Sequence, residues 1–245
     1  MTLAIIGGTG LTRLDGLEIT RREVVRTPFG EPSGPVIHGV LQGREVMFLA
    51  RHGYAHTIPP HQINYRANIW AMRHLGVRRV IAVAAVGGLA DEMEPGRLVF
   101  PDQIIDYTYG RRHTFFEQDL TDVVHIDFTY PYEQTLRDAL ISAADAAGLD
   151  AVPWGTYGAT QGPRLETAAE VRRLARDGCH VVGMTGMPEA ALAREAGLAY
   201  ATCAAVANWA AGIGGRTVTM EEIDANLVKG MERVRTLLAK AVPQL

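Results

Sequence analysis

Hydrophobic residues along the chain gather in short continuous runs, and longer stretches with helical periodicity separate these runs. The runs are rich in Val, Ile and Ala and several end at glycine, which is typical of strands covered on both faces. They predict strands at residues 2–6, 36–41, 46–50, 80–86, 98–105, 152–160, 180–184 and 199–208.

Between these runs, apolar residues recur at intervals of three and four, as on one face of a helix. The predicted helices cover residues 61–75, 131–147, 166–176, 189–196 and 219–240. Residues 107–129 are polar, aromatic and aperiodic, which predicts a long functional loop. Strands that alternate with helices, with no linker between them, predict one α/β domain over residues 1–245 with a central mixed β-sheet flanked by helices.

Composition narrows the possible partners. Of the 245 residues 47% are hydrophobic, and the net charge of -3 supplies no basic field for nucleic acid or an anionic membrane. Cys179 and Cys203 both stand in apolar surroundings, outside any metal-binding spacing, so we expect no metal and a reducing, cytoplasmic location. The start MTLAIIGG does not resemble a signal peptide, and no apolar segment is long enough to span a bilayer.

The turn IIGGTGL follows the first predicted strand and has the composition of an anion cradle. Its glycines let backbone N–H groups converge, and Thr9 adds a hydroxyl donor. A dinucleotide fingerprint needs a third glycine where Arg13 stands, and the lysine of a P-loop is missing. The turn therefore suits a small anion better than a nucleotide cofactor, and an ordinary tight turn explains it equally well.

Arg51 and His52 come directly after another strand. A guanidinium presents two parallel donors to a phosphate or carboxylate, and an imidazole adds a third. His56 and His61 lie nearby, but prolines interrupt the segment and no helix aligns the three histidines, so a metal site is not favoured. Structural or solvated histidines remain the alternative for His56 and His61.

Two further strand ends carry side chains that suit a ligand. Thr185 offers a hydroxyl where open α/β sheets bind their ligands. The adjacent Met184 either packs in the core or packs against a flat apolar face of the ligand. Asn208 is the lone polar side chain in the run CAAVANWAAGIGG. It either satisfies turn backbone or recognises a ligand.

Taken in order, IIGGTGL, TPFG, ARHG, NYRANIWAMRHLG, QGPR and MTGMPEAALAREAG resemble the trimeric purine nucleoside phosphorylase superfamily, and within it the methylthioadenosine phosphorylase branch. The resemblance extends from Ile5 to the terminal Leu245. It implies a nucleoside phosphorylase fold, a homotrimer, and a pentosyltransferase that uses nucleoside and inorganic phosphate without metal or organic cofactor.

The resemblance also implies a role for individual residues. The phosphate site falls on Thr9, Arg51, His52 and Thr185. Ala84 stands where the family has a further threonine, which puts one phosphate contact in doubt. Met184 would lie against the sugar and base, and His125 of the long loop would reach the 5′ pocket of a neighbouring subunit.

Asn208, Trp209 and Ala210 stand where the methylthioadenosine branch has an aspartate, a hydrophobic residue and a second aspartate. A carboxylate suits a 6-aminopurine, whereas an amide can donate to the O6 and N7 of a 6-oxopurine, and the purine nucleoside phosphorylase branch likewise has asparagine here. Asn208 is thus expected to be catalytic and base-selecting. Met220 stands approximately where 5′-hydroxyl phosphorylases have a histidine, and its thioether suits a methylthio group unless it simply packs in the core.

The expected reaction is phosphorolysis of methylthioinosine to hypoxanthine and 5-methylthioribose 1-phosphate, in purine salvage. Methylthioadenosine and general 6-oxopurine nucleosides are the alternative substrates. A nucleosidase that uses water, and a purine-binding protein without catalysis, are alternatives of other classes.

Overall fold

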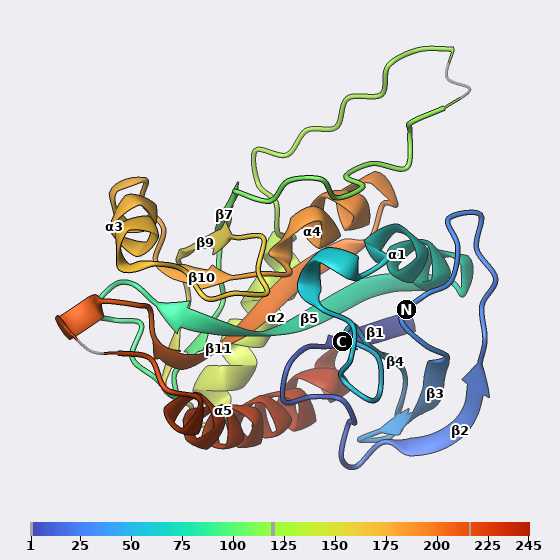
Figure 1. The fold of residues 1–245 in the computed structure, drawn as a ribbon. Helices are drawn as coiled ribbons and strands as arrows, with labels where there is room; N and C mark the ends of the chain where they lie inside the picture. The colour runs from blue at the N-terminus through green and yellow to red at the C-terminus, as the bar shows by residue number, and fades with distance from the viewer. Residues whose placement is uncertain (1, 119–120, 216) are drawn as a thin grey trace.

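A twisted mixed β-sheet runs through the centre of the molecule and helices pack on both of its faces (Figure 1). The computed structural model describes residues 2–118, 121–215 and 217–245, and in these residues the strands form one eleven-stranded sheet. The strands are β1 Thr2–Gly7, β2 Glu18–Glu23, β3 Val36–Leu41, β4 Arg44–Ala50, β5 Val77–Gly88, β6 Leu98–Val99, β7 Gln103–Asp106, β8 Ala151–Val152, β9 Thr156–Ala159, β10 Val181–Gly183 and β11 Ala199–Trp209. The α-helices are α1 Tyr65–His74, α2 Gln134–Ala146, α3 Ala168–Arg176, α4 Gly186–Glu195 and α5 Met220–Ala241, and the 3-10 turns are η1 Pro60–Gln62, η2 Ile213–Gly215 and η3 Val242–Gln244.

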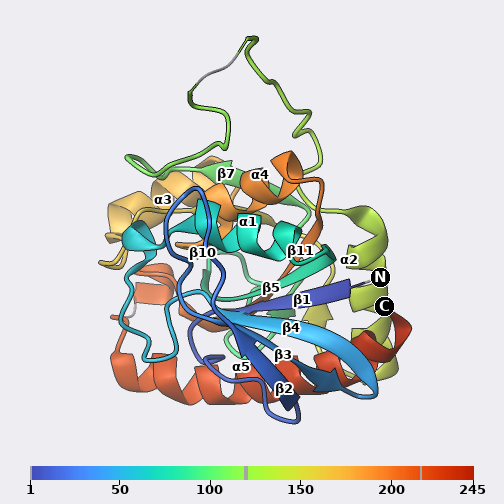
Figure 2. The same ribbon diagram turned by 90° about the vertical axis from the view of Figure 1, so that its right-hand side faces the viewer.

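β5 is the central strand, and this position explains why its sequence is almost entirely apolar. It pairs in parallel with β1 and β11 and antiparallel with β10. Its alternate residues enter two separate cores: Val80 and Ala82 face α1 and α4, while Ile81 and Val83 face α2 and α5. Figure 2 shows α5 and α1 on opposite sides of this sheet. The predicted α/β class with a mixed central sheet is therefore confirmed.

Two predicted strands are each divided in the structure. Residues 98–105 give β6 and β7, and residues 152–160 give β8 and β9. Pro101 and Pro153 fall in the gaps, where a residue without an N–H cannot continue the hydrogen-bond ladder. Helix α1 begins four residues later than predicted, because the Asn64 side chain accepts a hydrogen bond from the N–H of Ala67 and caps the helix there.

Strand β2 was not predicted from the sequence. It is polar, lies at the edge of the sheet beside β3, and leaves nearly all of its residues exposed. An edge strand with no buried face lacks the period-2 alternation that identifies strands.

β11 contains a bulge close to its carboxyl end. Val206 pairs with Val86 and Asn208 pairs with Gly87, so Ala207 is an extra residue on β11. A bulge of this kind re-aims the side chains that follow it. Everything before the bulge, from Tyr200 to Val206, is buried in the core.

The segment between β7 and α2 contains no helix or strand in its described part, in agreement with the predicted loop. It extends far beyond the body of the molecule (Figures 1 and 2). In residues 2–118, 121–215 and 217–245, no helix is both long and apolar enough to cross a membrane.

Candidate functional site

A cavity of about 270 Å³ opens at the edge of the sheet where several strands end. β1, β4, β5 and β11 run in the same direction, so the residues after β1 and β4 and those at the ends of β5 and β11 meet there. The predicted site residues that line the cavity are Thr9, His52, Ala84, Met184, Thr185, Asn208, Ala210 and Met220. Arg51, Trp209 and His125 do not line it.

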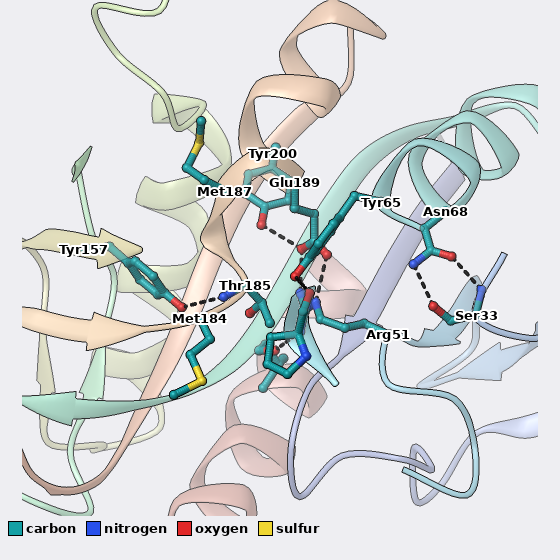
Figure 3. A network of polar contacts seen from close by, with 12 residues as sticks. Ser33, Arg51, Tyr65, Asn68, Tyr157, Met184, Thr185, Met187, Glu189 and Tyr200 are labelled. Carbon is teal, nitrogen blue, oxygen red and sulfur yellow. Dashed lines mark hydrogen bonds and ion pairs between the residues drawn. The ribbon is translucent and has the colours of Figure 1, made fainter. Parts of the chain in front are cut away.

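Arg51 lies beneath the glycine-rich turn and is held by Glu189 of α4 (Figure 3). Its Nε donates to Oε2 of Glu189 at 2.7 Å and its Nη2 to Oε1 at 2.5 Å, while Nη1 donates to the Val83 carbonyl at 2.7 Å. A Cβ on Gly8 would lie 2.9 Å from Nη1, so only glycine lets the turn pass this close. Of the five guanidinium N–H groups, two remain for a ligand among the residues described.

Glu189 has no exposed surface, and its carboxylate forms an ion pair with the guanidinium of Arg51. Its Oε1 also accepts from the Tyr200 hydroxyl at 2.8 Å. Burial alone would lower the pKa of Arg51, but the carboxylate of Glu189 outweighs burial and raises the pKa above its ordinary value. Arg51 therefore stays protonated, and its charge is neutralised within the protein. Sequence inspection assigned no role to Glu189, which stands 138 residues from Arg51.

His52 faces the cavity in a defined tautomer. Its Nδ1 lies 2.8 Å from the Ile58 carbonyl, which can only accept, so Nδ1 carries the proton. Burial lowers the pKa of His52 to about 4, so the ring is neutral at pH 7. The remaining nitrogen, Nε2, is then an acceptor, and donation from it to an anion first requires protonation.

Two hydroxyls approach the cavity near Arg51. Thr9 follows β1 and is half-buried, whereas Thr185 is only 7% exposed and occupies the N-cap position of α4. The Thr185 side chain makes no capping bond to the helix, and its backbone N–H points at the Tyr157 hydroxyl at 3.4 Å (Figure 3). These threonine hydroxyls make this end of the site suitable for an oxyanion, whereas Arg51 is 1% exposed and does not line the cavity.

At the other end, Asn208 is 9% exposed and has a fixed orientation. Its Nδ2 donates to the Trp209 carbonyl at 2.7 Å, which leaves one N–H and Oδ1 for a ligand. The sequence-based expectation that the amide donates to both O6 and N7 of a purine would require this bond to break. Trp209 is half-buried outside the cavity lining, whereas Ala210 is buried and lines it.

Glu166 is a further polar residue of the cavity lining, and it was not recognised from the sequence. It is half-buried, and its Oε1 accepts from the Thr160 hydroxyl at 2.5 Å. It stands two residues after the QGPR motif, in the connection between β9 and α3, and a carboxylate so close to that motif was the available signal. The cavity thus presents an amide donor and a carboxylate acceptor to the same ligand.

One wall of the cavity is apolar and is formed by residues just before and within the first turn of α5. Val218, Met220 and Ile223 contribute to it, and Thr219 caps the helix by accepting from the N–H of Glu222. Met220 is 60% exposed, so the alternative that it packs in the core is wrong. His125 is exposed on the long loop and takes no part in the cavity of its own chain.

No cluster of three His, Cys, Asp or Glu side chains suited to a metal occurs in residues 2–118, 121–215 and 217–245. His52 and His56 have ring centroids 4.7 Å apart, but no third ligand joins them in the described chain. Both cysteines are buried and free.

Comparison with known proteins agrees with this geometry. The model of the family described as "Phosphorylase superfamily" matches residues 2–243, and the chain belongs to that superfamily. A protein of Pseudomonas syringae pathovar tomato named "Probable S-methyl-5'-thioinosine phosphorylase" is 54% identical over 239 residues, which are 98% of this chain and 97% of the relative. The "6-oxopurine nucleoside phosphorylase" of Pyrococcus furiosus is 49% identical over 246 residues, covering 98% of this chain and 92% of the relative.

Among solved structures, methylthioadenosine phosphorylase from Schistosoma mansoni in complex with adenine superposes with a TM-score of 0.93. It is 32% identical, and the match covers 99% of this chain and 91% of that one. The predicted family and enzyme class are thereby confirmed. The protein is an enzyme of the purine nucleoside phosphorylase type, a pentosyltransferase, and enzymes of this family take phosphate as co-substrate and need no cofactor.

Proposed function

We propose that this enzyme cleaves methylthioinosine with phosphate, releasing hypoxanthine and 5-methylthioribose 1-phosphate. The observation that carries the choice of base is the pairing of Asn208 with Glu166 in one cavity. A 6-oxopurine has acceptors at O6 and N7 and a donor at N1–H. The free N–H of Asn208 and the carboxylate of Glu166 complement that pattern.

A 6-aminopurine has the opposite pattern along the same edge. Its exocyclic amine donates and its N1 accepts, so the amine could bond only to Oδ1 of Asn208, and N1 would meet the carboxylate of Glu166. Mismatched buried polar groups lose their hydrogen bonds to water without replacement, and sites built this way discriminate strongly.

The phosphate end of the proposal consists of Thr9, Thr185 and His52, which line the cavity, and of Arg51, which lies under Gly8 of the lining. Phosphate held there would lie beneath the anomeric carbon. The glycosidic bond would break toward an oxocarbenium-like cation, which the phosphate oxygens stabilise and then capture. Ala84 has no hydroxyl, so the β5 wall adds no side-chain donor at this point.

As the bond breaks, negative charge develops on the departing purine, at N7 and O6. The N–H of Asn208 would stabilise that charge more strongly in the transition state than in the bound nucleoside. Asn208 is therefore the proposed catalytic group on the leaving-group side, and Met184 packs against the sugar and base.

The 5′ preference rests on the apolar wall formed by Val218, Met220 and Ile223. A thioether and two branched side chains pack against a methylthio group and offer no hydrogen bond to a hydroxyl. The name of the Pseudomonas syringae relative supports this substrate. The name of the Pyrococcus furiosus relative supports a general 6-oxopurine nucleoside phosphorylase as the second candidate.

Phosphate dependence is the decisive test. Methylthioinosine, methylthioadenosine, inosine and adenosine are assayed with and without phosphate, and we expect phosphate-dependent cleavage with the highest kcat/KM for methylthioinosine. Equal rates without phosphate would identify a nucleosidase, and an equal kcat/KM for inosine would favour the second candidate.

The family resemblance also implies an oligomeric state for this enzyme. We propose a cytoplasmic homotrimer that acts in purine salvage, in which His125 of each loop closes the 5′ pocket of a neighbour. The buried, unpaired cysteines support a reducing compartment. Sedimentation of an active monomer would contradict the trimer, and His125→Ala with unchanged KM for the nucleoside would contradict the role of the loop.

A further inference from the structure

Arg111 is a buried arginine on the long segment between β7 and α2, and sequence inspection assigned it no role. Its side chain is held inside the protein at 8% exposure, and every N–H faces an acceptor. The acceptors are the carbonyls of Met184, Met187, Thr160 and Gln161, the side-chain oxygen of Gln161 and the Tyr65 hydroxyl, at 2.6 to 3.3 Å.

Four of these acceptors lie on two segments that lead to residues of the cavity lining. The carbonyls of Met184 and Met187, at 2.8 and 2.6 Å, lie one residue before and two residues after Thr185. The carbonyls of Thr160 and Gln161 begin the connection that leads to Glu166. One guanidinium therefore joins the segment that carries the proposed phosphate hydroxyl to the segment that carries the proposed base acceptor.

The charge of Arg111 also differs from that of Arg51. Arg51 is neutralised by Glu189, whereas Arg111 forms no ion pair with any carboxylate in the described ranges. His52 is neutral as well, so Arg111 is the cation that remains uncompensated next to the Met184–Thr185 backbone. Its charge is stabilised by the surrounding carbonyl and side-chain oxygens in place of a counter-ion.

We propose that Arg111 is a positioning residue for phosphate, a role that rests on the proposed phosphorolysis. Its hydrogen bonds to the carbonyls of Met184 and Met187 set the position of the backbone that holds Thr185. In this way the base of the long loop is coupled to the substrate site.

Arg137 provides a matched control. It is 4% exposed, and it likewise donates to backbone carbonyls, those of Phe100, Pro101 and Pro153, together with the Gln134 side chain. Unlike the acceptors of Arg111, those of Arg137 are not next to any residue of the cavity lining. Loss of Arg137 therefore reports the general cost of removing a buried arginine.

The experiment compares Arg111→Ala, Arg111→Lys and Arg137→Ala with the unaltered enzyme by steady-state kinetics. We expect Arg111→Ala to raise KM for phosphate about ten- to a hundredfold, the size of effect that a small misplacement of a binding group produces. Arg111→Lys keeps the charge but reaches fewer carbonyls, so it should recover part of the loss. Arg137→Ala should lower thermal stability without a change in KM for phosphate. Equal KM values in the Arg111 and Arg137 variants would overturn the proposal.

Amide hydrogen exchange of residues 184–187, measured without substrate, tests the positioning separately from the reaction. We expect exchange to accelerate in Arg111→Ala and Arg111→Lys but not in Arg137→Ala, and unchanged protection in all three would overturn the positioning role. If the unaltered enzyme shows no phosphate-dependent cleavage, the proposed function is wrong. The exchange measurement tests the positioning role independently of that result. The exchange measurement also serves if Arg111→Ala does not fold, because Arg111→Lys is the smaller perturbation.

Discussion

Asn208→Asp is the substitution that tests base selection most directly. In the structure the amide donates one N–H to the Trp209 carbonyl at 2.7 Å and has one N–H free in the cavity. The carboxylate has no N–H, so it leaves the Trp209 carbonyl without its donor and places an acceptor against O6 or N7 of the purine. Each unpaired buried group costs about 1–3 kcal/mol.

The Trp209 carbonyl loses its donor with either substrate, so only the group that faces the purine affects the substrate ratio. A loss of about 2 kcal/mol there corresponds to a roughly thirtyfold fall in kcat/KM for methylthioinosine. Methylthioadenosine no longer meets an amide N–H and is offered a charged acceptor for its exocyclic amine, a gain worth about tenfold, so the ratio between the two substrates should change by about 300-fold. Because Glu166 still faces the N1 acceptor of adenine, the reversal should be incomplete. Adding Glu166→Gln, whose amide can donate to N1, should move the ratio further.

The assay is the ratio of kcat/KM for methylthioinosine over methylthioadenosine in each variant. Asn68→Asp is the control, because Asn68 is also a buried amide, bonded to Ser33 through both its oxygen and its nitrogen and outside the cavity (Figure 3). It should lose stability and keep the substrate ratio. A ratio that ignores position 208, or an unaltered enzyme that already prefers methylthioadenosine, would refute the reasoning.

Three further predictions follow from the site. Glu189→Gln removes the buried partner of Arg51 and should lower the free energy of unfolding by about 3–5 kcal/mol, as measured by urea denaturation. Because burial lowers the pKa of His52 from 6.5 to about 4, the unfolded chain takes up a proton first as pH falls. Stability should therefore decrease between pH 6.5 and pH 4 by up to about 3 kcal/mol, and His52→Gln should remove that part of the decrease. Met220→His should raise kcat/KM for inosine relative to methylthioinosine about tenfold, through a new hydrogen bond to the 5′-hydroxyl, and an unchanged ratio would exclude contact at that position.

The sequence predicts the parts of the fold in which local pattern and burial agree. β5 and β11 were predicted because strands covered on both faces are apolar throughout, and α5 because its apolar stripe is regular. β2 was missed since an exposed edge strand carries no such pattern.

Most of the site residues that sequence reasoning singled out stand at strand ends, where position alone suggests a ligand; Met220, at the start of α5, and His125, on the long loop, were taken from the family resemblance. Glu189 and Arg111 were not recognised, because their partners lie 138 and 73 residues away and only the folded chain brings them together. Burial and hydrogen-bond partners decide what these groups do, and neither is visible in a local motif.

The bulge at Ala207 separates the part of β11 that packs in the core from the residues after it that line the cavity. From Tyr200 to Val206, the residues of β11 are buried in the core on both sides of the sheet. Beyond the extra residue, the strand's register with β5 is reset, and side chains at 208–210 can change without moving that core. Under the proposed function, substrate choice can therefore change at these few positions while the scaffold stays the same, and exchanging them between relatives is a direct route to enzymes for other purines.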